Sequence, residues 1–161
     1  MIPLRELSSR PTNWKGPEMS ADAIRQKVQR IVAEELGSVT VDKDGDVRVV
    51  HDSAVSFISV IEQENRTIVK IWSILAVEIP ATPDFYQWIA SEGQGYFFAR
   101  MIASPPDEHG QAWVKWEYDL LGDYLDRDEL LNAMHVVVGL SNDLDDEIVT
   151  KFGGRRWTDA D

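Results

Sequence analysis

The sequence contains no cysteine, which excludes disulfide bonds and thiolate metal sites. No stretch approaches the roughly 20 consecutive apolar residues of a membrane-spanning helix, and the first residues lack the apolar run of a signal peptide. Basic residues are few: 16 Lys and Arg stand against 28 Asp and Glu, which gives a formal net charge of −12. We therefore expect a soluble, cytoplasmic protein.

The acidic excess is concentrated in the C-terminal part of the chain, where residues 119–161 hold eleven Asp and Glu but four Lys and Arg. Binding to nucleic acid or to an anionic membrane requires clustered Lys and Arg, so we expect neither as a partner. A basic or amphipathic protein partner fits this charge better, although a solvated acidic surface explains the same pattern.

Motifs for catalysis and cofactor binding are also lacking. Residues 42–46 (Asp-Lys-Asp-Gly-Asp) space three carboxylates as a calcium loop does, but Val47 and Ser53 stand where an EF-hand needs Gly and Glu. The triplet at 51–53 (His-Asp-Ser) has the residue types of a catalytic triad, yet adjacent residues rarely reach triad geometry. The sequence has no glycine-rich phosphate loop. We expect no enzyme activity, no metal and no cofactor.

What the chain does contain is the hydrophobic periodicity of one α+β domain. The expected helices cover residues 20–37, 83–93 and 126–152, the last in two pieces that divide near residue 143. The expected strands cover residues 39–50 with a turn at Asp44-Gly45, 54–62, 67–79, 96–103 and 111–120. We place the domain at residues 18–154, between a flexible leader at 1–17 and a short tail at 155–161.

Two of the expected strands are apolar on both faces, which implies more apolar sheet than the helices can cover. In residues 54–62 and 67–79 large apolar side chains fill both alternating sets, whereas the odd positions of 111–120 are polar or charged beside Trp113. A partner subunit or a bound chain would shield the second face. The candidate partner-binding residues are Phe57, Trp72, Ile74, Phe97, Met101 and Trp113. Core packing is the alternative for each of them, except that the charged neighbours of Trp113 place it on the solvated side.

Three segments resemble the YbjN family: residues 41–47 with the acidic glycine turn, the strand pair across 54–74, and residues 144–156 with the ending Phe-Gly-Gly-Arg-Arg. That family has the fold of the type III secretion chaperones. The resemblance therefore implies an α+β fold of order α-β-β-β-α-β-β-α, with a twisted antiparallel sheet and helices mainly on one face. It also implies a non-enzymatic chaperone or adaptor that forms a homodimer and holds a peptide segment of a protein client.

A self-associating regulatory module of the sensory-transduction type, without a peptide client, is the second interpretation. A small-molecule enzyme is the third. The first two differ in whether the purified protein carries a specific polypeptide with it from the cytosol.

Overall fold

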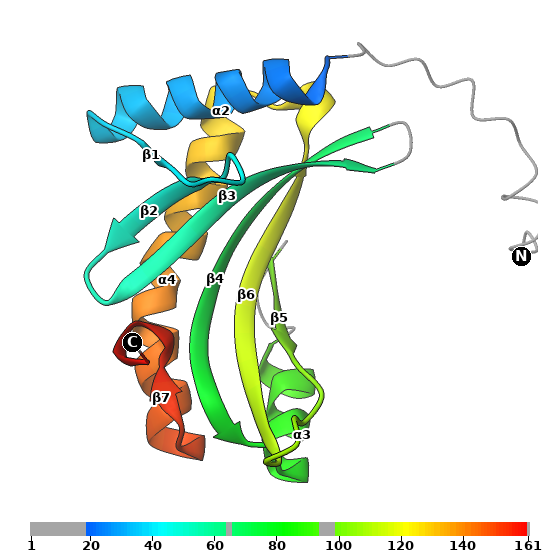
Figure 1. The fold of residues 1–161 in the computed structure, drawn as a ribbon, viewed down its shortest axis with the longest axis vertical. Coiled ribbons are helices and arrows are strands. Elements are labelled where there is room, and N and C mark those ends of the chain that lie inside the picture. The colour runs from blue at the N-terminus through cyan, green and yellow to red at the C-terminus, as the bar shows by residue number, and fades with distance from the viewer. Residues whose placement is uncertain (1–18, 64–65, 94–98, 161) are drawn as a thin grey trace, which may run out of the picture.

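The computed structural model describes residues 19–63, 66–93 and 99–160 (Figure 1). The expected leader at 1–17 and the candidate Phe97 lie outside the described residues. The strands are β1 (Thr40–Val41), β2 (Val47–His51), β3 (Ala54–Gln63), β4 (Arg66–Pro80), β5 (Ala99–Ala103), β6 (Gln111–Leu121) and β7 (Arg155–Arg156). The helices are α2 (Ala21–Leu36), α3 (Pro83–Glu92) and α4 (Arg127–Phe152), with short 3-10 turns η1 (Gly122–Tyr124) and η2 (Trp157–Asp159).

These strands form one antiparallel sheet in the order β1-β2-β3-β4-β6-β5, and β7 pairs with β4. The predicted α+β class and element order are confirmed in outline. Four strands rather than three precede α3, because residues 40–41 and 47–51 are separate strands joined by a tight turn. Gly45 takes φ of 88° in that turn, a conformation that glycine adopts without steric cost.

Local signals set the helix ends. Ser20, Thr82 and Asp126 each cap a helix by accepting a hydrogen bond from the backbone N–H three residues later. The predicted division of the last helix near residue 143 is wrong, since α4 runs unbroken for 26 residues. Its polar groups at that point are satisfied otherwise: the Ser141 hydroxyl donates to the Val137 carbonyl, and the Asn142 side chain accepts from Ser53 of the β2–β3 turn.

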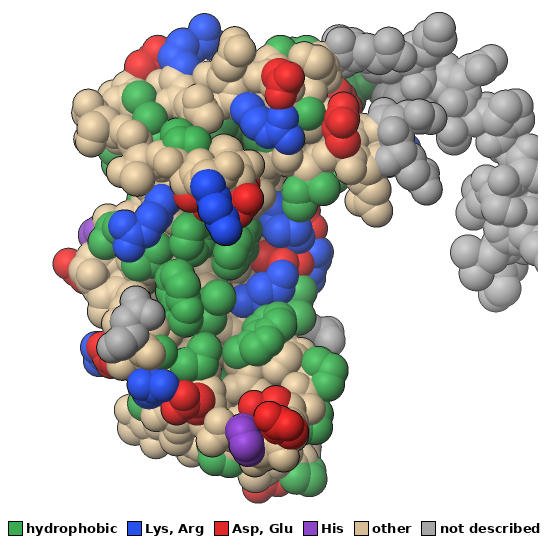
Figure 2. Space-filling model, viewed as in Figure 1, with side chains coloured by type: hydrophobic (Ala, Val, Ile, Leu, Met, Phe, Trp, Pro, Cys, Tyr) green, Lys and Arg blue, Asp and Glu red, His purple; other side chains and the backbone are tan. Residues whose placement is uncertain are grey.

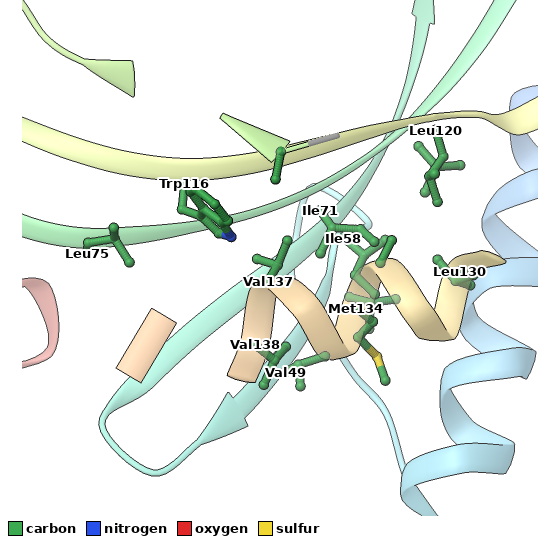
Figure 3. Packing of buried hydrophobic residues seen from close by; sticks show 14 of the residues in the cluster. Val49, Ile58, Ile71, Leu75, Trp116, Leu120, Leu130, Met134, Val137 and Val138 are labelled. Atoms are coloured by element: carbon green, nitrogen blue, oxygen red, sulfur yellow. The ribbon is translucent and has the colours of Figure 1, made fainter. Parts of the chain in front are cut away.

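The core lies between the sheet and α4, which contacts β2, β3, β4 and β6 (Figures 1 and 3). From the sheet, Ile71 and Trp116 are completely buried, and from α4 so are Leu130 and Val137. Full burial of one such side chain stabilises the fold by about 1.5–3 kcal/mol. Helix α2 adds Ile24, Val28, Ile31 and Val32 to the same cluster. Among the described residues, no helix is both long and apolar enough to span a membrane.

Strand alternation gives the sheet a second face, opposite α4, which we call the open face. In β4 the residues Val69, Ile71 and Ser73 are buried toward the helices, while the intervening Lys70 and Trp72 stay partly exposed. Because no helix packs along the open face in the described part of the chain, its side chains are the ones that a partner can reach (Figure 1).

Candidate functional site

An aromatic pair lies at the middle of the open face. Phe57 of β3 and Trp72 of β4 are directly opposite in the antiparallel register, and their rings stack with centroids 4.6 Å apart. The Trp72 indole N–H donates to the Ser59 hydroxyl at 2.9 Å, and that hydroxyl donates to the Asp46 carboxylate at 2.5 Å. The pair is therefore held in one orientation while both rings remain partly exposed.

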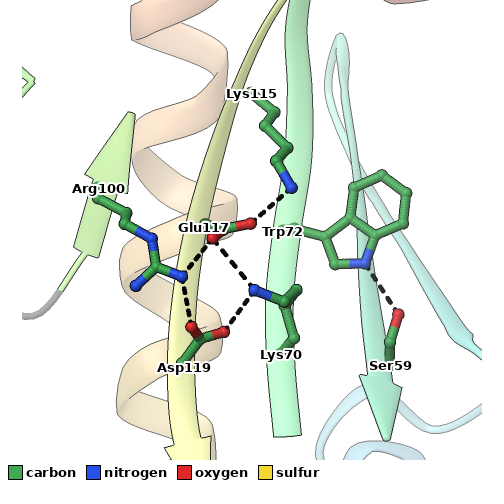
Figure 4. Close-up of polar contacts among 7 residues, drawn as sticks. All are labelled: Ser59, Lys70, Trp72, Arg100, Lys115, Glu117 and Asp119. Carbon is green, nitrogen blue, oxygen red and sulfur yellow. Dashed lines mark hydrogen bonds and ion pairs between the residues drawn. The ribbon is translucent and has the colours of Figure 1, made fainter. Parts of the chain in front are cut away.

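Charged side chains from three strands form a network beside this pair (Figure 4). Glu117 of β6 lies within 3.1 Å of Lys70, 2.5 Å of Arg100 and 2.6 Å of Lys115. Asp119 makes further ion pairs with Lys70 at 2.7 Å and Arg100 at 2.5 Å. Three cations thus meet two carboxylates, which gives this part of a strongly acidic chain a local positive excess.

Glu117 is almost completely buried, with 2% of its surface exposed. Burial alone would raise the pKa of this carboxyl group, but hydrogen bonds from Lys115, Lys70 and Arg100 outweigh it and lower the pKa below its ordinary value. A carboxylate held ionised by three cations is a poor proton donor or acceptor near neutral pH. The network fixes β4, β5 and β6 relative to one another and brings polar groups to the open face.

Figure 2 shows hydrophobic side chains gathered at the centre of the viewed face, between groups of Lys, Arg, Asp and Glu side chains. Apolar residues at the rim are more exposed than those at the centre. The most exposed apolar side chains of the open-face set are Val50 at 56%, Leu121 at 44%, Ile61 at 41% and Trp113 at 40%. This mixture of anchored aromatic rings, charges and an apolar rim is typical of a protein-binding surface rather than of a small-molecule pocket.

The structure brings Phe57, Trp72 and Ile74 together on the open face, as the strand alternation predicts. Trp113 is also on this side and is 40% exposed, in agreement with its charged neighbours. Met101 is placed differently from our expectation: it is 7% exposed and pairs with the buried Trp116 on the helix side. The strand register decides this, because Arg100, its neighbour in β5, takes the open-face position opposite Glu117.

The charged network and Trp157 belong to this surface and are not among the candidates that the sequence indicates. Lys70 and Arg100 belong to the network, and Trp157 of η2 contacts Phe57 edge-on, with ring centroids 5.9 Å apart. The charged alternation of β6 was a signal for the network, because ionised groups on a sheet need partners on neighbouring strands. For Trp157 the signal is an aromatic residue after two arginines, in the segment that the sequence predicts to be a short tail.

Two carboxylates of the acidic turn at 42–46, those of Asp42 and Asp46, accept hydrogen bonds from protein groups. Asp42 accepts from the backbone N–H groups of Asp44 and Asp46 at 2.9 and 3.0 Å, and Asp46 accepts from Ser59. In residues 19–63, 66–93 and 99–160, no group of three or more His, Asp and Glu side chains is arranged to hold a metal ion. Glycine at Gly45 and the Asx-type bonds of Asp42 account for this turn.

Comparisons with known proteins agree with this architecture. Residues 22–160 match the family model described as T3SS (YopN, CesT) and YbjN peptide-binding chaperone 1. A chain in the crystal structure of the ExsC–ExsE complex superposes with a TM-score of 0.54 at 15% sequence identity, covering 77% of this chain and 95% of that one. At this identity the structural likeness concerns the fold. No curated protein matches the sequence.

Proposed function

This chain belongs to the family of T3SS and YbjN peptide-binding chaperones, and on that premise we propose that its open face binds an extended segment of a protein client without catalysing a reaction. The observation that carries the proposal is the Phe57–Trp72 stack, which is anchored by Ser59 and partly exposed on the face of the sheet opposite α4. Rigid aromatic anchors lose little conformational entropy when a partner covers them, and they dominate many protein interfaces.

The network around Glu117 would serve this binding as a polar border. Its charges are already paired within the sheet, so a client segment can pass over them without leaving an unpaired buried charge. The aromatic pair would supply affinity, and the partly exposed Lys115 and Asp119 would orient polar groups of the client.

We propose further that the protein is a homodimer. The exposed rim residues Val50, Ile61 and Leu121 support this, because large apolar side chains on one face favour burial against a second surface. Self-association without a peptide client is the second candidate function, and it rests on the same rim. The cytoplasmic location expected from the sequence stays a prediction.

Selection from a library of random peptides displayed on phage tests the proposed function. Peptides enriched on the wild-type protein should bind in solution, and Trp72→Ala should weaken that binding at least tenfold. Trp88→Ala is the matched control, because Trp88 packs on Phe152 at the junction of α3 and α4 and not on the open face. Failure to enrich any peptide, or equal loss of binding in both variants, would contradict the proposal. If the wild type binds no peptide while it forms a stable dimer, self-association is the better description.

A further inference from the structure

The chain turns back onto the sheet after α4. Gly153 and Gly154 both have positive φ, at 80° and 82°, and they redirect the backbone toward β4. A Cβ on Gly154 would lie 2.5 Å from the Val77 carbonyl oxygen and 3.1 Å from the Ile79 Cα, so no larger residue fits without displacing the backbone. Immediately after this close approach, β7 pairs antiparallel with Ala76 and Val77.

The two residues of β7 take a place on β4 that β3 leaves open. The β3–β4 pairing extends from Gln63 and Arg66 to Ser56 and Ser73, whereas β4 continues to Pro80. Beyond Ser73 this side of β4 is not paired with β3, and β7 is the strand that pairs with it at Ala76 and Val77. Such an edge accepts any extended strand whose side chains suit its surroundings.

Three consecutive side chains of the C-terminal segment fit these surroundings. Arg155 forms an ion pair with Glu78 at 2.5 Å. Arg156 is paired with Asp146 and lies 3.8 Å from the nearly buried carboxylate of Asp145 on α4. Trp157 reaches the open face and packs edge-on against Phe57. The carboxylates of Glu78, Asp145 and Asp146 thus form ion pairs with two consecutive basic residues. Phe57 packs against the aromatic residue that follows them.

We infer that this edge of β4 is a binding site for a short extended peptide in which two basic residues precede an aromatic one, and that residues 155–157 occupy it as an intramolecular competitor. The inference rests on the proposed function, since it names the chemistry of one class of partner and a means of regulating the open face. A peptide that takes the site displaces Trp157 and packs its own aromatic residue against Phe57.

The small contact between residues 155–157 and β4 allows a free peptide to replace this segment. The bridge to β4 is two residues long, and both arginines retain solvent exposure, so the segment can leave without unfolding of the rest of the sheet. While it is attached, however, the segment acts at an effective concentration of roughly millimolar order. Free peptide therefore competes poorly against the intact chain, and binding becomes strong when the segment is released.

The test uses the full chain and a fluorescent synthetic peptide with the sequence of residues 153–161, Gly-Gly-Arg-Arg-Trp-Thr-Asp-Ala-Asp. Gly154→Ala should release the segment and raise the affinity for this peptide at least tenfold over wild type. Arg156→Glu should also release the segment, because the new carboxylate is repelled by Asp145 and Asp146. It should therefore raise the affinity for the peptide in the same way. Gly139→Ala is the matched control, because it makes the same chemical change on an exposed part of α4 and should leave binding at the wild-type level.

A peptide with both arginines replaced by glutamate should bind none of these proteins tightly. The inference is overturned if neither Gly154→Ala nor Arg156→Glu gains affinity, or if the glutamate peptide binds as well. Light scattering tests whether a second copy of the chain takes the site instead. A variant that forms larger assemblies than the wild-type protein, in place of binding peptide, assigns the site to the segment of a second copy, which also overturns the inference. Phage-selected peptides that still bind in a Trp72-dependent way show that only this inference has failed and that the proposed function stands.

Discussion

Glu117 shows how a single buried charge supports the open face. Burial raises the pKa of its carboxyl group, but the hydrogen bonds from Lys115, Lys70 and Arg100 lower it below the ordinary value of 4.5. The folded state therefore binds this proton less readily than the unfolded state. Its stabilisation is complete above pH 4.5 and is lost as the pH falls through the lower folded pKa.

Glu117→Gln should accordingly reduce the free energy of unfolding by about 1.5–3 kcal/mol at neutral pH, because charge-assisted hydrogen bonds to a buried group are lost. Urea unfolding at a series of pH values measures this. The difference between wild type and variant should shrink as the pH falls below 4.5 and through the lower folded pKa. Glu108→Gln, at an exposed carboxylate of the loop before β6, should change little at any pH. If the difference in the free energy of unfolding between wild type and Glu117→Gln stayed constant with pH, the network would stabilise the fold by packing and not by the charge of Glu117.

Trp113 and Trp116 provide a second comparison between residues, since they lie on opposite faces of β6. Trp113 is 40% exposed and Trp116 is completely buried. Trp116→Ala should cost about 3–5 kcal/mol of stability. Trp113→Ala should leave the thermal midpoint nearly unchanged and weaken dimerisation or peptide binding. Calorimetry together with a binding assay distinguishes them, and a large fall in midpoint for Trp113→Ala would identify it as a packing residue.

At the scale of elements, the start of each helix depends on a local capping residue that can be recognised in the sequence. Each of the three helices begins after a Ser, Thr or Asp whose side chain accepts from a backbone N–H group of the first turn. The continuity of α4 was not predictable in the same way. Its polar residue Asn142 resembles a new cap in the sequence, but its partner is Ser53, 89 residues away along the chain. Long-range partners of this kind override a local signal.

Gly139 offers a test of α4 as an uninterrupted helix. It is exposed, and a Cβ at this position would have no atom within 4 Å. Gly139→Ala should therefore raise the free energy of unfolding by about 0.5–1 kcal/mol, because glycine loses more conformational freedom than alanine in a helix. Thermal or urea unfolding measures the change. Destabilisation by this substitution would show that the helix is broken or covered at that point.

For the molecule as a whole, strand alternation predicted that a face of the sheet would lie open, and it placed Phe57, Trp72, Ile74 and Trp113 on it. It could not place Met101, since the face of a residue in β5 depends on its register with β6. The attachment of residues 155–157 to β4 was also beyond sequence analysis. A two-residue strand has no periodicity, and its pairing depends on the two glycines and on carboxylates from β4 and α4.

The exposed rim predicts a homodimer in solution. Light scattering at micromolar concentration should give twice the chain mass of 18.3 kDa. Ile61→Lys should shift the protein toward the monomer by placing a charge among the apolar rim residues, whereas Val136→Lys on α4 makes the same kind of change off the open face and should not. A wild-type protein that stays at 18.3 kDa would contradict the dimer.

The central claim is that a client segment lies on the open face, and site-specific photo-crosslinking tests it most directly. Benzoylphenylalanine in place of Trp113 on the open face, or in place of Val136 on α4, gives two probes whose parent residues are 40% and 38% exposed. With a phage-selected peptide, we predict a strong crosslink from position 113 and none from position 136. Crosslinking from position 136 alone, or equally from both, would contradict binding at the open face.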